Sequence, residues 1–221
     1  MTPKTKYKCI ILDHDDTTVN STAEVNYPAL LDTLSHLRPN VKPNYEEFMD
    51  SCFEPGFFEY CTEILALNSD EMRFEYNNWK RFVSEIIPTA CPGMARIIER
   101  QREAGGIICT VSHSESDNIL RDWKAAFNSA PDAVYGWDAG EGKRKPEPFP
   151  VLDIMEKFSL APSDILVIDD LKTGYGMARN AGVGFAAALW AQPSRLCREF
   201  MKNNADVCFY ETAELERYLF E

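Results

Sequence analysis

The stretch Cys9-Ile-Ile-Leu-Asp-His-Asp-Asp-Thr17 decides the fold of this 221-residue chain. Its first four residues are apolar, and a run of that length is typical of a buried parallel strand. Polar residues begin at Asp13, where such a strand would end. In an open α/β sheet the carboxyl ends of the strands converge on one crevice. We therefore expect the aspartates that follow Leu12 to lie in a functional site.

Three further fragments carry polar groups to the same place. Ser112 follows the apolar run 107–111, and Asp169-Asp170 follows the apolar run 165–168. The third fragment is Lys145, which is followed by a proline. Residues that are far apart in the sequence can meet at one edge of a parallel sheet. The sequence therefore predicts an enzyme whose carboxylates, hydroxyl and ammonium group gather at that edge.

In this order, the four fragments resemble the motifs of the haloacid dehalogenase (HAD) superfamily. The resemblance covers the whole chain and rests on Asp13-x-Asp15, Ser112, Lys145-Pro146 and Asp169-Asp170. It implies an α/β fold: a Rossmann-like, doubly wound parallel sheet with an inserted helical cap domain. Members of the superfamily are mostly magnesium-dependent phosphohydrolases that work through an aspartyl-phosphate, so the resemblance implies a phosphatase that uses Mg²⁺.

The resemblance gives each acidic residue a role. Asp13 is the expected nucleophile, and Asp15 is the expected general acid/base. Mg²⁺ prefers oxygen ligands, and the resemblance implies that Asp13, Asp170 and the backbone carbonyl of Asp15 hold it, with Asp169 secondary. The side chain of Asp15 is then left free to protonate the leaving alcohol and to take a proton from the attacking water.

The resemblance also assigns Ser112 and Lys145 to the phosphoryl oxygens of the substrate. Lys145 would in addition offset the crowding of like-charged carboxylates. His113 stands where the family often has Asn, so it either touches the phosphate or substrate or is a loop histidine without a ligand. His14 lies between the two aspartates, and we expect it to be structural, with its side chain turned away from the metal.

Two positions depart from the family pattern. Asp16 stands where a glycine normally lets the backbone turn closely past the metal and phosphate. We expect a more constrained loop and a more negative site, with altered metal affinity. Gly174 occupies the place where many members have another acid that orients a metal-bound water, and the Asp169-Asp170 pair is expected to compensate.

Residues 22–87 contain no convincing strand, and their apolar positions recur at intervals of three and four, as at Leu30, Leu34 and Leu37. This region predicts a helical cap domain over residues 19–90, with hinges near both ends. The core domain would comprise residues 1–18 and 91–221, because strand and helix patterns alternate from there onward. Expected strands there cover residues 107–111, 165–168, 183–187 and the vicinity of Val207.

Composition excludes several classes of partner. The net charge of −12 repels nucleic acid and anionic membranes. The first eight residues are polar and do not resemble a signal peptide, so a cytoplasmic protein is expected. Seven cysteines without a Cys-x-x-Cys pattern predict reduced, buried thiols. The sequence gives no indication of the oligomeric state.

The expected substrate is a small phosphorylated metabolite. Residues 53–67 of the cap contain no Lys or Arg, which favours a neutral or cationic leaving group. The segment 53–60 is either a specificity loop, because Pro-Gly breaks a helix there, or part of a small hydrophobic core. A phosphosugar mutase and a non-catalytic binding or regulatory protein are the alternatives. A dehalogenase and a phosphonate-cleaving enzyme are disfavoured, by the presence of Asp15 and by the lack of a cap lysine motif.

Overall fold

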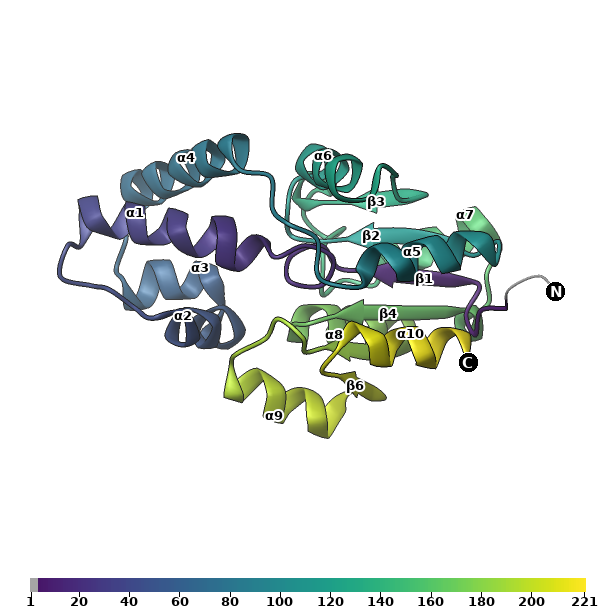
Figure 1. Ribbon diagram of the computed structural model, residues 1–221. Helices are drawn as coiled ribbons and strands as arrows, with labels where there is room; N and C mark the ends of the chain where they lie inside the picture. Colours follow the sequence, from purple (N-terminus) through teal and green to yellow (C-terminus); the bar gives the residue numbers. More distant parts are fainter. Residues whose placement is uncertain (1–3) are drawn as a thin grey trace.

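The computed structural model describes residues 4–221, and it shows a six-stranded parallel sheet beside a helical insert (Figure 1). The strand order is β3-β2-β1-β4-β5-β6. The strands are β1 (Cys9–Leu12), β2 (Ile107–Val111), β3 (Ala133–Tyr135), β4 (Ile165–Asp169), β5 (Gly184–Ala188) and β6 (Val207–Phe209). All neighbouring strands run parallel, so the predicted doubly wound sheet is confirmed.

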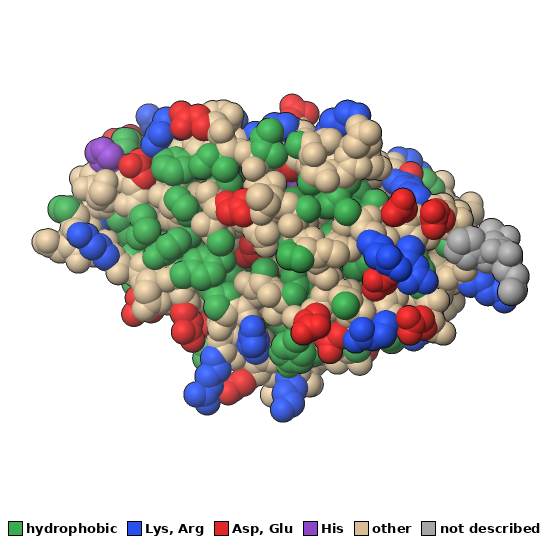
Figure 2. All heavy atoms as spheres, viewed as in Figure 1, with side chains coloured by type: hydrophobic (Ala, Val, Ile, Leu, Met, Phe, Trp, Pro, Cys, Tyr) green, Lys and Arg blue, Asp and Glu red, His purple; other side chains and the backbone are tan. Residues whose placement is uncertain are grey.

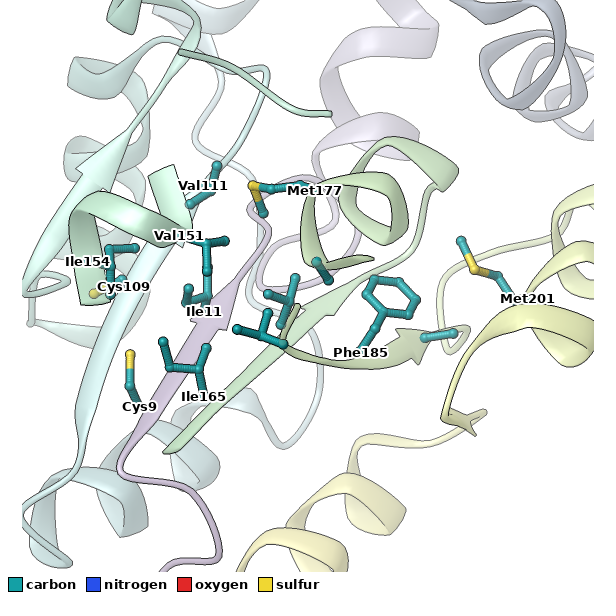
Figure 3. Close-up of a cluster of buried hydrophobic side chains, with 14 of the residues drawn as sticks. Cys9, Ile11, Cys109, Val111, Val151, Ile154, Ile165, Met177, Phe185 and Met201 are labelled. Atoms are coloured by element: carbon teal, nitrogen blue, oxygen red, sulfur yellow. The ribbon is translucent and has the colours of Figure 1, made fainter. Parts of the chain in front are cut away.

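Helices cover both faces of the sheet, because alternate residues of each central strand point to opposite sides. Cys9 and Ile11 of β1 belong to one hydrophobic cluster, and Ile10 and Leu12 belong to the other. The helices are α5 (Met94–Glu103), α6 (Ser116–Phe127), α7 (Phe149–Phe158), α8 (Lys172–Ala181), α9 (Arg195–Asn204) and α10 (Thr212–Phe220). Helices α7, α8 and α9 contribute to the first cluster (Figure 3), and α5, α6 and α10 contribute to the second.

The helical insert follows β1 and has a hydrophobic core of its own. Its helices are η1 (Thr22–Asn26), α1 (Tyr27–Leu37), α2 (Tyr45–Ser51), η2 (Cys52–Gly56), α3 (Phe57–Glu59), η3 (Tyr60–Ile64) and α4 (Ser69–Glu85). Asn44 caps α2 and Asn68 caps α4, each with a glutamate three residues later. Each asparagine side chain accepts a backbone amide of the first helical turn, which satisfies a donor that would otherwise lack a partner.

Two chain segments join the insert to the sheet, and they pair with each other. The amide of Asn20 donates to the carbonyl of Thr89 at 2.9 Å, and the amide of Cys91 donates to the carbonyl of Thr18 at 2.9 Å. The predicted boundaries after residues 18 and 90 fall on this pair, and the hinges remain a prediction. Within residues 4–221, none of the helices combines the length and apolar character needed to cross a bilayer.

The sequence missed β3 and placed β5 one residue too early. β3 has three residues, too few for a periodic signal, and it forms by pairing with β2 at the edge of the sheet. Two short 3₁₀ turns also escaped prediction, η4 (Trp137–Ala139) and η5 (Pro162–Asp164).

Candidate active site

The structure brings the predicted fragments together at the carboxyl edge of the central strands. Lys145, from the loop before α7, reaches between β1 and β4. Its Nζ lies 2.7 Å from Oδ1 of Asp13 and 2.6 Å from Oδ2 of Asp169. Oxygens of Asp13, Asp169 and Asp170 lie within 4.8 Å of one another, and all four residues are buried. One ammonium group thus faces three crowded carboxyl groups.

Burial dominates the electrostatics of this cluster. It raises the pKa of Asp13 to about 7, although Lys145 acts in the opposite direction. Burial and the charges of Asp13 and Asp169 also raise the pKa of Asp170 well above its ordinary value. Burial opposes the charge on Lys145, but the two neighbouring carboxylates outweigh it and raise the pKa of the lysine. Asp13 and Asp170 therefore hold their protons more tightly than exposed aspartates do.

The oxygen atoms of the cluster fit a hard divalent cation. Asp169 is already engaged, because its Oδ2 accepts from Lys145 and its Oδ1 accepts from the amide of Leu171 at 2.8 Å. Within the described residues, Oδ2 of Asp13 and Oδ1 of Asp170 accept no hydrogen bond. Carboxylate oxygens of this kind are the ligands that Mg²⁺ prefers. The acidic cluster therefore has the chemistry of a divalent metal site.

The side chain of Asp15 is engaged rather than free of protein partners. Its Oδ2 accepts from the hydroxyls of Ser112 at 3.1 Å and Ser114 at 2.8 Å, and its Oδ1 accepts from Ser21 at 2.5 Å. Burial alone would raise the pKa of Asp15, but His14 and these three hydroxyls outweigh it and lower the pKa. The sequence singled out Ser112 as a phosphate ligand, whereas here its hydroxyl holds Asp15. Ser21 and Ser114 were missed, since a lone serine carries no motif.

Asp16 adopts a left-handed backbone conformation, with φ of 59°, where the family pattern has glycine. Aspartate visits this region more readily than most residues. Its buried Oδ1 accepts from the amide of Thr22 at 3.2 Å, at the start of the insert. Burial raises the pKa of Asp16 to about 7. Asp16 is thus a further buried acid with a raised pKa in the loop after β1.

Gly174 lies in the first turn of α8, directly against Asp169. A Cβ atom at position 174 would lie 2.1 Å from Cγ of Asp169. An acid at this position would therefore displace Asp169 from its present contact with Lys145. The observed conformation of Asp169 therefore requires that position 174 carries no side chain.

The two histidines differ in their surroundings. His14 is buried, with Nε2 3.1 Å from Oδ2 of Asp122 and Nδ1 3.3 Å from the hydroxyl of Thr18. His113 donates from Nε2 to the backbone carbonyl of Lys145 at 3.0 Å. Burial and the charge of Lys145 lower the pKa of His113. His113 thus supports the loop that carries Lys145, and Asp122 is a partner that the sequence did not reveal.

Segment 53–60 places two buried side chains, Phe53 and Tyr60, in hydrophobic clusters, whereas its residues 54, 58 and 59 are exposed. Phe53 belongs to a core cluster of the sheet domain, and Tyr60 belongs to the core of the insert. Phe58 is 62% exposed. On the face drawn in Figure 2, acidic and basic side chains are interspersed, and hydrophobic side chains gather over the insert at the left. The sequence left two interpretations of this segment, a specificity loop and part of a hydrophobic core. The packing of Phe53 and Tyr60 agrees with the second.

Comparisons with known proteins agree with this geometry. The family model for the haloacid dehalogenase-like hydrolases matches residues 10–188. Protein CbbY, plasmid, from Cupriavidus necator is 32% identical over 100 residues. That alignment covers 42% of this chain and 37% of the relative, so this chain matches well under half of the relative's length.

Solved structures show the same fold. A mutant of CbbY from Rhodobacter sphaeroides in complex with xylulose-(1,5)bisphosphate superposes with a TM-score of 0.73 and 19% identity, over 95% of this chain and 96% of that one. A predicted phosphoglycolate phosphatase from Haemophilus somnus gives a TM-score of 0.78 and 19% identity, over 96% and 98% of the two chains. At this identity the likeness concerns the fold alone.

Proposed function

The chain belongs to the haloacid dehalogenase-like hydrolase family, and from that premise we propose that it is a Mg²⁺-dependent phosphatase of a small phosphorylated metabolite. The observation that carries the proposal is the position of Lys145 between Asp13 and Asp169, beside Asp170. This arrangement provides a buried carboxylate nucleophile, a cation beside it, and oxygen ligands for a metal.

The proposed reaction proceeds in two steps through Asp13. Its carboxylate attacks phosphorus, the bond to the leaving oxygen breaks, and Asp15 supplies the proton that the leaving alcohol needs. Water then attacks phosphorus, Asp15 takes a proton from it, and inorganic phosphate leaves while Asp13 is regenerated. Mg²⁺, held by Asp13, Asp170 and the Asp15 carbonyl, with Asp169 secondary, would neutralise the repulsion between carboxylate and phosphate.

The hydroxyls around Asp15 give these proton transfers a physical basis. Three hydroxyl donors favour the ionised carboxylate of Asp15. If a phosphoryl oxygen takes over the hydroxyl of Ser112, Asp15 loses one of these donors and its proton affinity rises. Substrate binding would therefore favour uptake of a proton from solvent by Asp15, which then acts as the acid, and product release would restore its partners.

The charge of the insert segment 53–67 bears on which leaving group the substrate carries. The CbbY structure from Rhodobacter sphaeroides contains a sugar bisphosphate. In this chain residues 53–67 carry no Lys or Arg, and the nearby Lys172 is already paired with Glu54. A second phosphate has no free cation in this segment, which supports a monophosphate substrate and disfavours a mutase that grips a bisphosphate.

A screen of phosphorylated metabolites tests the proposal, with released phosphate measured with and without Mg²⁺. We expect stoichiometric phosphate release from a monophosphate, dependence on Mg²⁺, and no need for a bisphosphate activator. An isomerised sugar phosphate as the main product, formed only with a bisphosphate present, would identify a mutase. No turnover of any ester in the screen would favour a binding protein.

A further inference from the structure

The buried Gln192 in the loop between β5 and α9 touches the acidic cluster. Its Nε2 donates to Oδ2 of Asp170 at 3.0 Å, and its Oε1 accepts from the backbone amide of Ser194 at 3.1 Å. A backbone amide can only donate, so it fixes which end of the Gln192 side chain faces it. The NH₂ group is thereby aimed at Asp170. Gln192 holds one oxygen of this carboxyl and leaves the other open.

Ser194 extends this contact to the helical insert. Its buried hydroxyl donates to Oδ1 of Asp50 on α2. Oγ of Ser194 also accepts from the amide of Cys197 at 3.1 Å, and Ser194 thereby caps α9. The hydrogen bonds therefore form a continuous series from Asp50 through Ser194 and Gln192 to Asp170. One end of the series lies in the insert, and the other end lies in the candidate metal site.

The same segment of the insert also contacts the chain just after Asp170. Glu54, four residues after Asp50, pairs with Lys172, which comes two residues after Asp170. Between these two contacts, the 6% exposed Phe53 packs edge-on against Phe200, with ring centroids 5.5 Å apart. Residues 50–54 thus contact the β5–α9 loop, helix α9 and the start of α8, which follows Asp170.

We propose that Gln192 and Ser194 are positioning residues that couple docking of the insert to metal binding by Asp170, an inference that rests on the proposed function. A metal ion on the open oxygen of Asp170 would hold this carboxyl group in one orientation. The oxygen that accepts from Gln192 would then be fixed as well, and the β5–α9 loop would present the Ser194 hydroxyl to Asp50. Because such coupling is reciprocal, a docked insert favours metal binding to the same extent.

Two variants break the link from opposite sides without touching a proposed metal ligand. Asp50→Ala removes the acceptor in the insert. Ser194→Gly removes the hydroxyl without a change of charge, and glycine keeps most of the capping ability at the start of α9. Asp32→Ala is the matched control, because Asp32 pairs with Arg81 inside the insert at 2.9 Å.

The first measurement is Mg²⁺ affinity by calorimetry on the substrate-free protein. We expect each linking variant to bind Mg²⁺ about fivefold more weakly than wild type, with the double variant no weaker than either single one. Asp32→Ala should bind as wild type does. Wild-type affinity in both linking variants would overturn the coupling.

The second measurement is hydrogen exchange of the amides in residues 50–56. Mg²⁺ should slow this exchange in wild type and have no effect in Ser194→Gly. Unchanged exchange on addition of Mg²⁺ to wild type would overturn the coupling while leaving the proposed phosphatase intact. A wild-type protein that does not bind Mg²⁺ at all would overturn both proposals.

Discussion

Asp13, Asp15 and Asp16 are close in sequence, yet their surroundings give them different proton affinities. Burial raises the pKa of Asp13 and of Asp16 to about 7, whereas hydroxyl donors and His14 lower the pKa of Asp15. Environments that separate the pKa values of neighbouring acids also separate their roles. In the proposed mechanism Asp15, whose carboxylate accepts more hydrogen bonds than those of Asp13 and Asp16, is the residue that transfers protons.

Replacing Asp15 by Asn tests that division. The backbone carbonyl remains, so Asp15→Asn should keep its Mg²⁺ affinity while losing turnover, most severely with substrates whose leaving groups are poor. Calorimetry and steady-state kinetics with a series of leaving groups measure the two effects. The comparison variant is Asp170→Asn, and an equal loss of Mg²⁺ affinity in both would contradict the proton-transfer role.

Gly174→Ala tests the steric requirement beside Asp169. The added methyl group would overlap the carboxyl group of Asp169 and force it away from Lys145. We expect weaker Mg²⁺ binding and a lower kcat. Gly184→Ala at the start of β5 is the control, because a Cβ there would come no closer than 3.4 Å to its nearest neighbour, Cδ1 of Leu166. Equal activity in the two variants would show that the Asp169 position does not matter.

At the scale of elements, two variants in segment 53–60 test whether its aromatic side chains serve packing or specificity. Phe53 is 6% exposed, and Phe58 is 62% exposed. Phe53→Ala should lower the free energy of unfolding by about 3 kcal/mol, measured in urea. Phe58→Ala should change it by less than about 0.5 kcal/mol. Unchanged stability of Phe53→Ala combined with a raised KM would indicate a specificity loop instead.

Some elements could be predicted because their signal is local, and others could not. Strands β1 and β4 contain uninterrupted apolar runs that are followed directly by Asp13 and Asp169, so both the strands and the site residues were readable. β3 depends on its partner β2, and three residues carry no period. Gln192 and Ser194 gain their roles only when the β5–α9 loop meets the insert. Contacts of this kind arise from tertiary structure and leave no spacing pattern in the sequence.

At the scale of the whole molecule, a net charge of −12 and several buried acids make stability depend on pH. Asp16 has a pKa of about 7 in the folded protein and roughly 3.9 when unfolded. The folded state therefore binds its proton more tightly, and stability is lost as the pH rises through this interval. The loss is complete above about pH 7.

Asp16→Asn isolates this contribution, since asparagine tolerates the left-handed conformation and still accepts from the amide of Thr22. Without metal, the variant should be more stable than wild type at pH 8, and the difference should shrink toward pH 4. Thermal unfolding in EDTA across this range measures it. A difference that stays constant with pH would contradict the raised pKa of Asp16.

The central claim is that every turnover passes through an acyl phosphate, an aspartyl-phosphate, on Asp13. Acid quenching within the first turnover, followed by borohydride reduction, converts an aspartyl-phosphate into homoserine, which mass spectrometry locates in the sequence. We predict homoserine at position 13 only, and none in Asp13→Asn, whose turnover should fall by roughly 10⁴-fold or more. Homoserine at another aspartate, its absence from the wild-type protein, or substantial turnover by Asp13→Asn would contradict the account.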